Sequence, residues 1–290
     1  NSGLIVNQGF EFMLYSTPVQ TKDFTFDLNI NLSRNVSKVK ELADGVDYLF
    51  FNGDANFPIN VGTRVGHRLG EIYAKNLYKR DENGNMIVNK QGRPTKVSGE
   101  DAFQYTLDHP IGNIEPDLLM SVSPSFTYKG FTLSALFDMK FGGDIVSVSE
   151  AMATSTGLAA RTANRGNAEN GWKIVAPGVT ADGTVNSTAM NAQRYYTSMS
   201  GMAEEFVYDA SFIKLKELSL GYSFPKSILK KTPLTSLNVA FVARNLAYLM
   251  KHTPGTSPEG GYDTSMFSQA IDYMSVPYTR TFGLSINLGF

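Results

Sequence analysis

Histidine is the side chain most often used as a general base or a metal ligand. This sequence has three, His67, His109 and His252. Catalytic and metal sites need several such groups clustered at ligand spacing. We interpret each histidine as isolated, without an acidic residue or a second histidine at that spacing. We therefore interpret the three histidines as ordinary loop residues and expect no metal site.

An acidic run at residues 81–85, Asp-Glu-Asn-Gly-Asn, hints at a calcium loop. Its glycine, Gly84, comes too early for an EF-hand-type loop, and no glutamate closes the run at the expected distance. The Asn83-Gly84 pair is instead a strong signal for a hairpin turn. We therefore predict a turn at the tip of a loop.

Nucleophilic and cofactor chemistry also lacks a recognisable motif. Cysteine is absent, so there is no thiolate nucleophile, disulfide or thiolate metal site. Neither a Gly-x-Ser-x-Gly elbow nor a phosphate-binding glycine loop occurs. We expect a protein that is not an enzyme and that needs no cofactor.

Aromatic residues in the polar, irregular stretches are the remaining candidates for a binding function. They are Trp172, Tyr195, Tyr196, Tyr262 and Tyr273. Such side chains could stack on a sugar or hold a peptide, which makes them candidate substrate contacts. They could equally pack loop against loop or contact a partner protein, because aromatics anchor interfaces as readily as ligands. We favour the packing interpretation and keep both open.

The C-terminal segment alternates apolar residues with small or polar ones. Its apolar residues are Phe282, Leu284, Ile286, Leu288 and Phe290. Successive side chains of a β-strand point to opposite faces, so the pattern predicts a strand with one apolar and one polar face. Ending on an aromatic residue is typical of the closing strand of an outer-membrane barrel. The residues that we expect to face lipid are Phe282, Leu284, Ile286 and Leu288.

Six further segments repeat this alternation with varying clarity. They lie near residues 10–14, 24–33, 118–128, 131–141, 212–224 and 237–244. Segments of about ten residues suit a tilted strand that crosses a bilayer. Aromatic residues near several segment ends suit the girdles at the two membrane interfaces.

Composition narrows the class further. The 290 residues are 42% hydrophobic with a net charge of −1, so no basic excess exists to neutralise nucleic-acid phosphates. The apolar runs are far shorter than the roughly 18–20 residues that a membrane-spanning helix needs. A closed barrel is the other structure that satisfies every backbone group in lipid.

The connections between the predicted strands alternate in length. Short ones fall at residues 16–23, 129–130 and 225–236, and long ones at 35–117, 142–211 and 249–276. Outer-membrane barrels have short periplasmic turns and long extracellular loops. Because seven strands leave two edges open, we expect an all-β chain that is the C-terminal portion of a large antiparallel transmembrane barrel. Both edge strands should pair with the rest of that barrel.

Several stretches resemble the SusC/RagA-type TonB-dependent transporters of the Bacteroidota outer membrane. In chain order they read NQGFEFMLYSTPVQTKDFTFDLNINLSRNVSKVKEL, YKGFTLSALFDMKFGGDI, YDASFIKLKELSLGYSFPKSIL, NVAFVARNLAYLMKHTPG and RTFGLSINLGF. Each motif is short, but their order up to the terminal Phe290 makes the resemblance specific. It implies that residues 1–290 are one barrel section whose plug domain, TonB box and first strands lie elsewhere.

The resemblance also implies a function and partners. The expected function is TonB-dependent import of glycans or oligopeptides across the outer membrane of a Gram-negative bacterium. The implied partners are the rest of the barrel with its plug, a SusD-like surface lipoprotein as lid, TonB and outer-membrane lipid. Phe290 is expected to act as a signal for barrel assembly.

Two alternatives remain at this point. A soluble all-β carbohydrate-binding or adhesin-like module would show the same alternation, but its apolar strand faces would have to pack against a second sheet. A porin without a plug would differ only in the missing N-terminal part.

Overall fold

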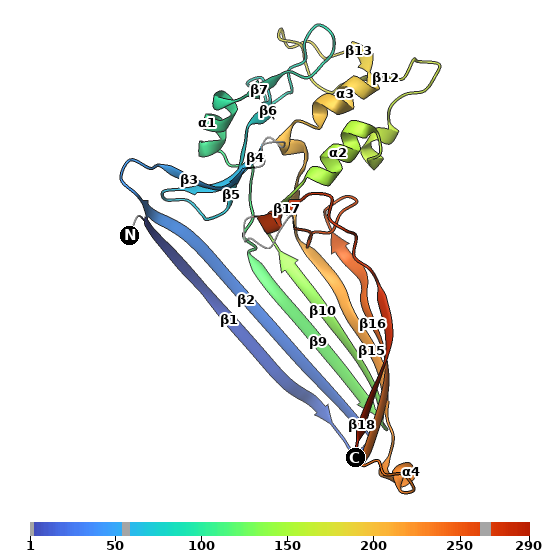
Figure 1. Ribbon diagram of the computed structural model, residues 1–290. Helices are drawn as coiled ribbons and strands as arrows, with labels where there is room; N and C mark the ends of the chain where they lie inside the picture. The colour runs from blue at the N-terminus through green and yellow to red at the C-terminus, as the bar shows by residue number, and fades with distance from the viewer. Residues whose placement is uncertain (1–2, 54–58, 262–267) are drawn as a thin grey trace.

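The computed structural model describes residues 3–53, 59–261 and 268–290. Seven long strands form one antiparallel sheet in which each strand pairs with the next long strand along the chain (Figure 1). In order across the sheet they are β1 (Gly3–Gln20), β2 (Phe24–Leu42), β9 (Leu118–Tyr128), β10 (Phe131–Phe141), β15 (Phe212–Ser223), β16 (Ser236–Lys251) and β18 (Thr281–Gly289). The predicted up-and-down order of seven strands is confirmed.

Strand register aligns the apolar residues of neighbouring strands on one face of this sheet. One row of directly opposed residues crosses all seven strands through Val19, Phe26, Phe126, Leu133, Leu220, Phe241 and Leu284. Phe26 and Phe126 stack with their ring centroids 4.7 Å apart. We call the side of the sheet that carries this apolar row the apolar face.

The neighbouring row carries small and polar residues and belongs to the opposite, polar face. It runs through Gln20, Thr25, Thr127, Thr132, Gly221, Ala240 and Ser285. Thr127 and Thr132 share a hydrogen bond of 3.1 Å. The period-two alternation in the sequence therefore produces a sheet with two chemically different faces.

Short turns gather at one end of the sheet, together with the C-terminus (Figure 1). The tightest is Lys129-Gly130, where both residues have a positive φ, of 48° and 90°. Two such residues favour the two-residue hairpins whose twist matches that of the strands. The connection between β15 and β16 contains the short helix α4 (Lys226–Leu229).

An aromatic row crosses four strands near this turn end, through Phe24, Tyr128, Phe131 and Tyr222. The rings of Phe131 and Tyr222 are 4.5 Å apart. This is the arrangement that the sequence predicts for one interfacial girdle.

The three long connections are residues 43–117, 142–211 and 252–280. Their described parts lie together at the opposite end of the sheet (Figure 1), and we call them the loop cap. They are not irregular. The first holds β3 (Tyr48–Gly53), β4 (Ile59–Arg64), β5 (Glu71–Ala74), β6 (Asn76–Tyr78), β7 (Lys96–Ser98), α1 (Glu100–Asp108) and β8 (Gly112–Asn113). The second holds β11 (Asp144–Ser147), α2 (Val148–Thr156), β12 (Lys173–Val175), β13 (Ala189–Asn191), α3 (Ala192–Met199) and β14 (Val207–Asp209), and the third holds β17 (Ile271–Asp272).

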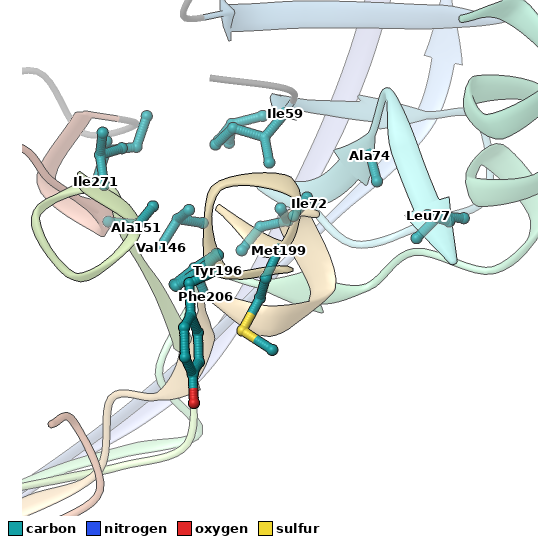
Figure 2. Close-up of a cluster of buried hydrophobic side chains, with 14 of the residues drawn as sticks. Ile59, Ile72, Ala74, Leu77, Val146, Ala151, Tyr196, Met199, Phe206 and Ile271 are labelled. Atoms are coloured by element: carbon teal, nitrogen blue, oxygen red, sulfur yellow. The ribbon is translucent and has the colours of Figure 1, made fainter. Parts of the chain in front are cut away.

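The loop cap has its own hydrophobic core. Figure 2 shows side chains from all three connections converging there, among them Ile72 of the first, Phe206 of the second and Ile271 of the third. All three are almost completely buried. Strands β14, β11 and β17 also form one small sheet that joins the second and third connections. The cap is thus a packed unit, which positions its polar residues firmly.

The structure also revises several predicted boundaries. Strands β1 and β2 pair as far as Gly3 and Leu42, so the first long connection begins several residues later than predicted. In β15 a bulge at Lys216 shifts the register, with Glu217 opposite Leu136 and Leu215 opposite Phe137. Helices within the described residues are too short or too polar to cross a membrane.

Candidate functional site

The polar face of the sheet pairs its charged side chains with one another. Lys216 Nζ lies 2.6 Å from Asp138 Oδ2, and Arg244 Nε donates to Glu217 Oε2 at 2.8 Å. Asp27 accepts a hydrogen bond of 2.7 Å from Thr17. These cross-strand contacts line the polar face, and two of them are ion pairs whose charges cancel.

The third connection is fastened to the sheet by a buried lysine. Lys214 of β15 is 2% exposed, and its Nζ lies 2.6 Å from Glu259 Oε2. Tyr248 also donates a hydrogen bond to Glu259, and the Lys214 ammonium sits 4.2 Å above the ring of Tyr278. A buried ammonium needs a carboxylate partner, so the contact holds the cap to the strand ends. Tyr248 and Tyr278 line this contact.

The first connection is fastened in a similar way by Glu115. Its Oε2 accepts a hydrogen bond of 3.2 Å from the backbone N–H of Ser37 in β2. The guanidinium of Arg68 lies 3.8 Å from Glu115 and 3.3 Å from Asp117. The hydrogen bond from Ser37 therefore joins the cap to β2, and the two charge pairs of Arg68 brace the end of the first connection just before β9.

Arg161 organises the second connection. It donates to Glu205 Oε2 at 3.1 Å and to the Tyr208 hydroxyl at 2.7 Å, and it lies 5.0 Å over the ring of Phe206. Its Nε is 3.7 Å from Glu150, a carboxyl whose pKa is raised by burial. Nothing in the local sequence marks this residue, because its partners are distant along the chain.

Tyr195 and Tyr196 lie in the core of the cap. Both are buried on α3, and their rings meet edge to face with centroids 5.1 Å apart. The Tyr196 hydroxyl donates to the carbonyl oxygens of Arg161 and Asn164 at 3.0 and 2.8 Å. Burial raises the pKa of Tyr195 to about 12. These contacts give both tyrosines a packing role, which is the interpretation that the sequence favours.

The other three candidate aromatics lie in different settings. Tyr273 is half-buried against the core of the cap, and Tyr262 lies outside the described residues. Trp172 is 50% exposed, and its φ of 56° is unusual for a residue with a side chain. It lines a cavity of about 680 Å³ together with Arg165 and Tyr196. Substrate contact therefore stays a prediction, and Trp172 has the most suitable setting for it.

The histidines are less isolated than the sequence interpretation holds. His67 Nδ1 is 3.1 Å from Glu71 Oε1, four residues further along the chain, so the interpretation of His67 as isolated from acidic residues is wrong. His252 lies 3.7 Å from Asp209, and His109 packs on Tyr105. Within the described ranges no three histidine, aspartate or glutamate side chains converge on a point where a metal ion could sit.

The Asp81 run folds as the predicted turn. Asp81 Oδ1 accepts hydrogen bonds from the backbone N–H groups of Asn83 and Asn85, at 2.9 and 2.8 Å. Gly84 has a φ of 81°, a left-handed conformation that glycine adopts without strain. The carboxylate is thereby used to close the loop tip.

The terminal strand exposes its apolar residues. Phe282, Leu284, Ile286 and Leu288 each have half or more of their surface exposed, and Phe290 extends beyond the last paired residue, Gly289. Strands β1 and β18 are the two outer strands of the sheet, and they do not pair with each other among the described residues. The seven strands therefore do not close into a small barrel of their own.

The whole chain is similar to known proteins. No protein-family model matches it. It is 28% identical over 308 residues to TonB-dependent receptor P3 of Formosa agariphila, and 27% identical over 305 residues to TonB-dependent receptor SusC of Bacteroides thetaiotaomicron. All of this chain is covered in both cases, against 29% and 27% of those receptors.

Solved structures give the same picture of the fold. The RagAB peptide importer in its closed-closed state matches with a TM-score of 0.65 and 19% identity, covering 100% of this chain and 30% of the matched one. A second RagAB peptide transporter structure matches with a TM-score of 0.66 and 18% identity, over 100% of this chain and 29% of the matched one. The chain thus spans about three tenths of the length of its relatives. Over that whole span the resemblance to SusC/RagA-type TonB-dependent transporters is confirmed, and the fold is that of a section of their β-barrel.

Proposed function

We propose that residues 1–290 form the C-terminal part of the barrel wall of a TonB-dependent nutrient importer in the outer membrane. The observation that carries the proposal is the apolar row from Val19 to Leu284, which crosses every strand of the sheet. The similar proteins are named as TonB-dependent receptors. The plug and the first strands belong to the rest of the parent protein.

Lipid is the environment that suits the apolar face. Leu284 is 66% exposed, and Phe241, Leu220 and Leu133 of the same row are also exposed. Soluble proteins rarely expose apolar patches beyond a few hundred Å². A soluble carbohydrate-binding or adhesin-like module would need a second apolar layer over this row, and none of the described residues supplies one.

The open edges indicate what the chain is bound to. An unpaired strand edge leaves N–H and C=O groups without partners, which lipid does not tolerate. Strands β1 and β18 therefore pair with the preceding part of the same barrel. Phe290, at the end of β18, acts in assembly of the barrel and takes no part in binding cargo.

Cargo passes along the polar face in this proposal. A SusD-like lipoprotein covers the loop cap as a lid, and a glycan or oligopeptide binds between the two. TonB then displaces the plug, and the cargo moves past the hydrated wall that holds Asp138 and Arg244. Balanced charges such as the Lys216–Asp138 pair keep this wall wet without trapping ions. No covalent bond is made or broken.

Cell fractionation and uptake test the proposal together. The parent protein should be recovered in the outer-membrane fraction, and its deletion should abolish growth on at least one glycan or peptide source. Loss of TonB should abolish the same uptake while leaving the amount of folded protein unchanged. Recovery of the protein in a soluble fraction, or uptake that continues without TonB, would contradict the proposal.

A further inference from the structure

We propose that the loop cap carries a binding groove for an oligosaccharide with anionic substituents, on both sides of the start of α3. One cavity of about 700 Å³ and a second of about 680 Å³ meet there. Both are lined by Asn191 and Gln193, so the end of β13 and the start of α3 form a shared wall. Figure 1 places α3, β12 and β13 at the end of the cap that lies away from the seven-stranded sheet. The inference rests on the proposed function in that it names the cargo class.

The groove is positively charged. Arg93 and Arg194 line the first cavity and Arg165 lines the second, while neither lining includes an aspartate or a glutamate. None of the three arginine side chains forms an ion pair or a hydrogen bond with another described residue. The chain as a whole has a net charge of −1, so this excess is local. Free guanidinium forks match the geometry of carboxylate and sulfate groups.

The remaining lining favours a sugar over an acidic peptide. Side-chain amides come from Asn89, Gln91, Asn191 and Gln193, with hydroxyls from Thr197 and Ser198. Amides and hydroxyls both donate and accept hydrogen bonds, as sugar hydroxyls require. Aliphatic side chains are few in the two linings, and those of Met190 and Ala192 are buried. Neither lining contains a leucine, isoleucine, valine or phenylalanine, so apart from Trp172 the groups that could select a ligand are amides, hydroxyls and guanidinium groups.

Trp172 supplies an aromatic surface beside the arginines. Its backbone N–H donates to Asn167 at 2.8 Å, and its carbonyl accepts from the N–H of Ala192 at 3.0 Å. The side chain of Asn170 braces the same turn by accepting from the N–H groups of Asn167 and Lys173. Left-handed backbone at a residue with a large side chain is strained, and such strain gathers at ligand-binding positions. The turn therefore holds a half-exposed indole where a sugar ring can stack on it.

Binding to the detergent-purified, full-length parent protein tests the groove. The probes are a carboxylated oligogalacturonate, a sulfated galactan oligosaccharide, a neutral galactan oligosaccharide and an oligoglutamate peptide. We expect at least one anionic sugar to bind about tenfold or more tightly than the neutral one, and more weakly at high salt. Which of the two binds distinguishes carboxylate from sulfate recognition.

Single substitutions then locate the site. Arg165→Gln and Arg194→Gln should each weaken binding of the anionic sugar by roughly three- to tenfold. Trp172→Ala should weaken its binding by a similar factor. Lys173→Gln is the matched control, because it removes one positive charge next to Trp172 but from outside both linings. Resistance of each variant to unfolding in unheated detergent gels checks that it is folded.

Any of four results would overturn the groove proposal. They are that no probe binds, that the neutral sugar binds as tightly as the anionic ones, that the arginine variants bind the anionic sugar normally, or that only oligoglutamate binds. If these occur while TonB-dependent uptake of another nutrient persists, the proposed function stands without the groove. If an anionic sugar binds as expected but uptake does not require the protein, the groove stands and the importer proposal fails.

Discussion

Leu284 and Ser285 are neighbours in the chain that face opposite sides of the sheet. Leu284 continues the apolar row opposite Phe241, and Ser285 continues the polar row opposite Ala240. A charged side chain on a lipid-facing strand position costs about 2–4 kcal/mol near the bilayer midplane. Leu284→Arg should therefore reduce the amount of folded barrel, whereas Ser285→Arg should be better tolerated. Quantifying folded and unfolded bands in outer-membrane fractions would show the difference, and equal tolerance would contradict a lipid-facing β18.

Arg161 and Arg165 are a second matched pair, because only Arg161 is committed to contacts within the cap. Arg161→Met leaves Glu205 and the Tyr208 hydroxyl without their donor. Losing hydrogen bonds to a charged group in this partly buried site should destabilise the cap by about 1–3 kcal/mol. Arg165→Met should leave cap stability unchanged, since the Arg165 side chain forms no ion pair or hydrogen bond with another described residue. Hydrogen exchange of the cap amides measures both effects. Equal protection in the two variants would show that Arg161 does not stabilise the cap.

At the scale of elements, alternation in the sequence predicted the strands well because each long strand has two different faces. The bulge in β15 could also have been predicted, because the parity of the apolar positions changes within this strand. Ile213 and Leu215 occupy odd positions, whereas Leu218 and Leu220 occupy even ones, and Lys216 is the extra residue between them. Helices α2 and α3 were not predictable, because short helices draw their stability from packing in the cap. The Lys214–Glu259 contact was equally hidden, since its partners meet only after the third connection folds back.

The bulge leads to a prediction about deletions. Removing Lys216 should leave Leu215 opposite Phe137 and Glu217 opposite Leu136, so that every side chain keeps its face. Removing Ser219 should shift the intervening residues by one position, and this moves the charge of Glu217 to the apolar face. We expect the Lys216 deletion to fold and the Ser219 deletion to fail in outer-membrane assembly. Lys216→Ala is the control for the lost ion pair with Asp138, an exposed contact worth about 1 kcal/mol or less. Equal failure of both deletions would show that the bulge is needed for assembly.

At the scale of the whole molecule, the two outer strands decide whether this section completes a larger barrel. Every second backbone N–H of β18 points away from its neighbour β16, and the same holds for β1 relative to β2. In a closed barrel these outward amides are hydrogen-bonded to further strands of the parent protein. Residue-resolved hydrogen exchange on the full-length protein should therefore find all amides of residues 281–289 protected, without the alternation of an open edge. The small hairpin of β12 and β13 provides the internal control, because its two strands pair only with each other among the described residues. Rapid exchange at every second amide of β18, as in that hairpin, would mean that the sheet is open at this edge and that the chain is not part of a transporter wall.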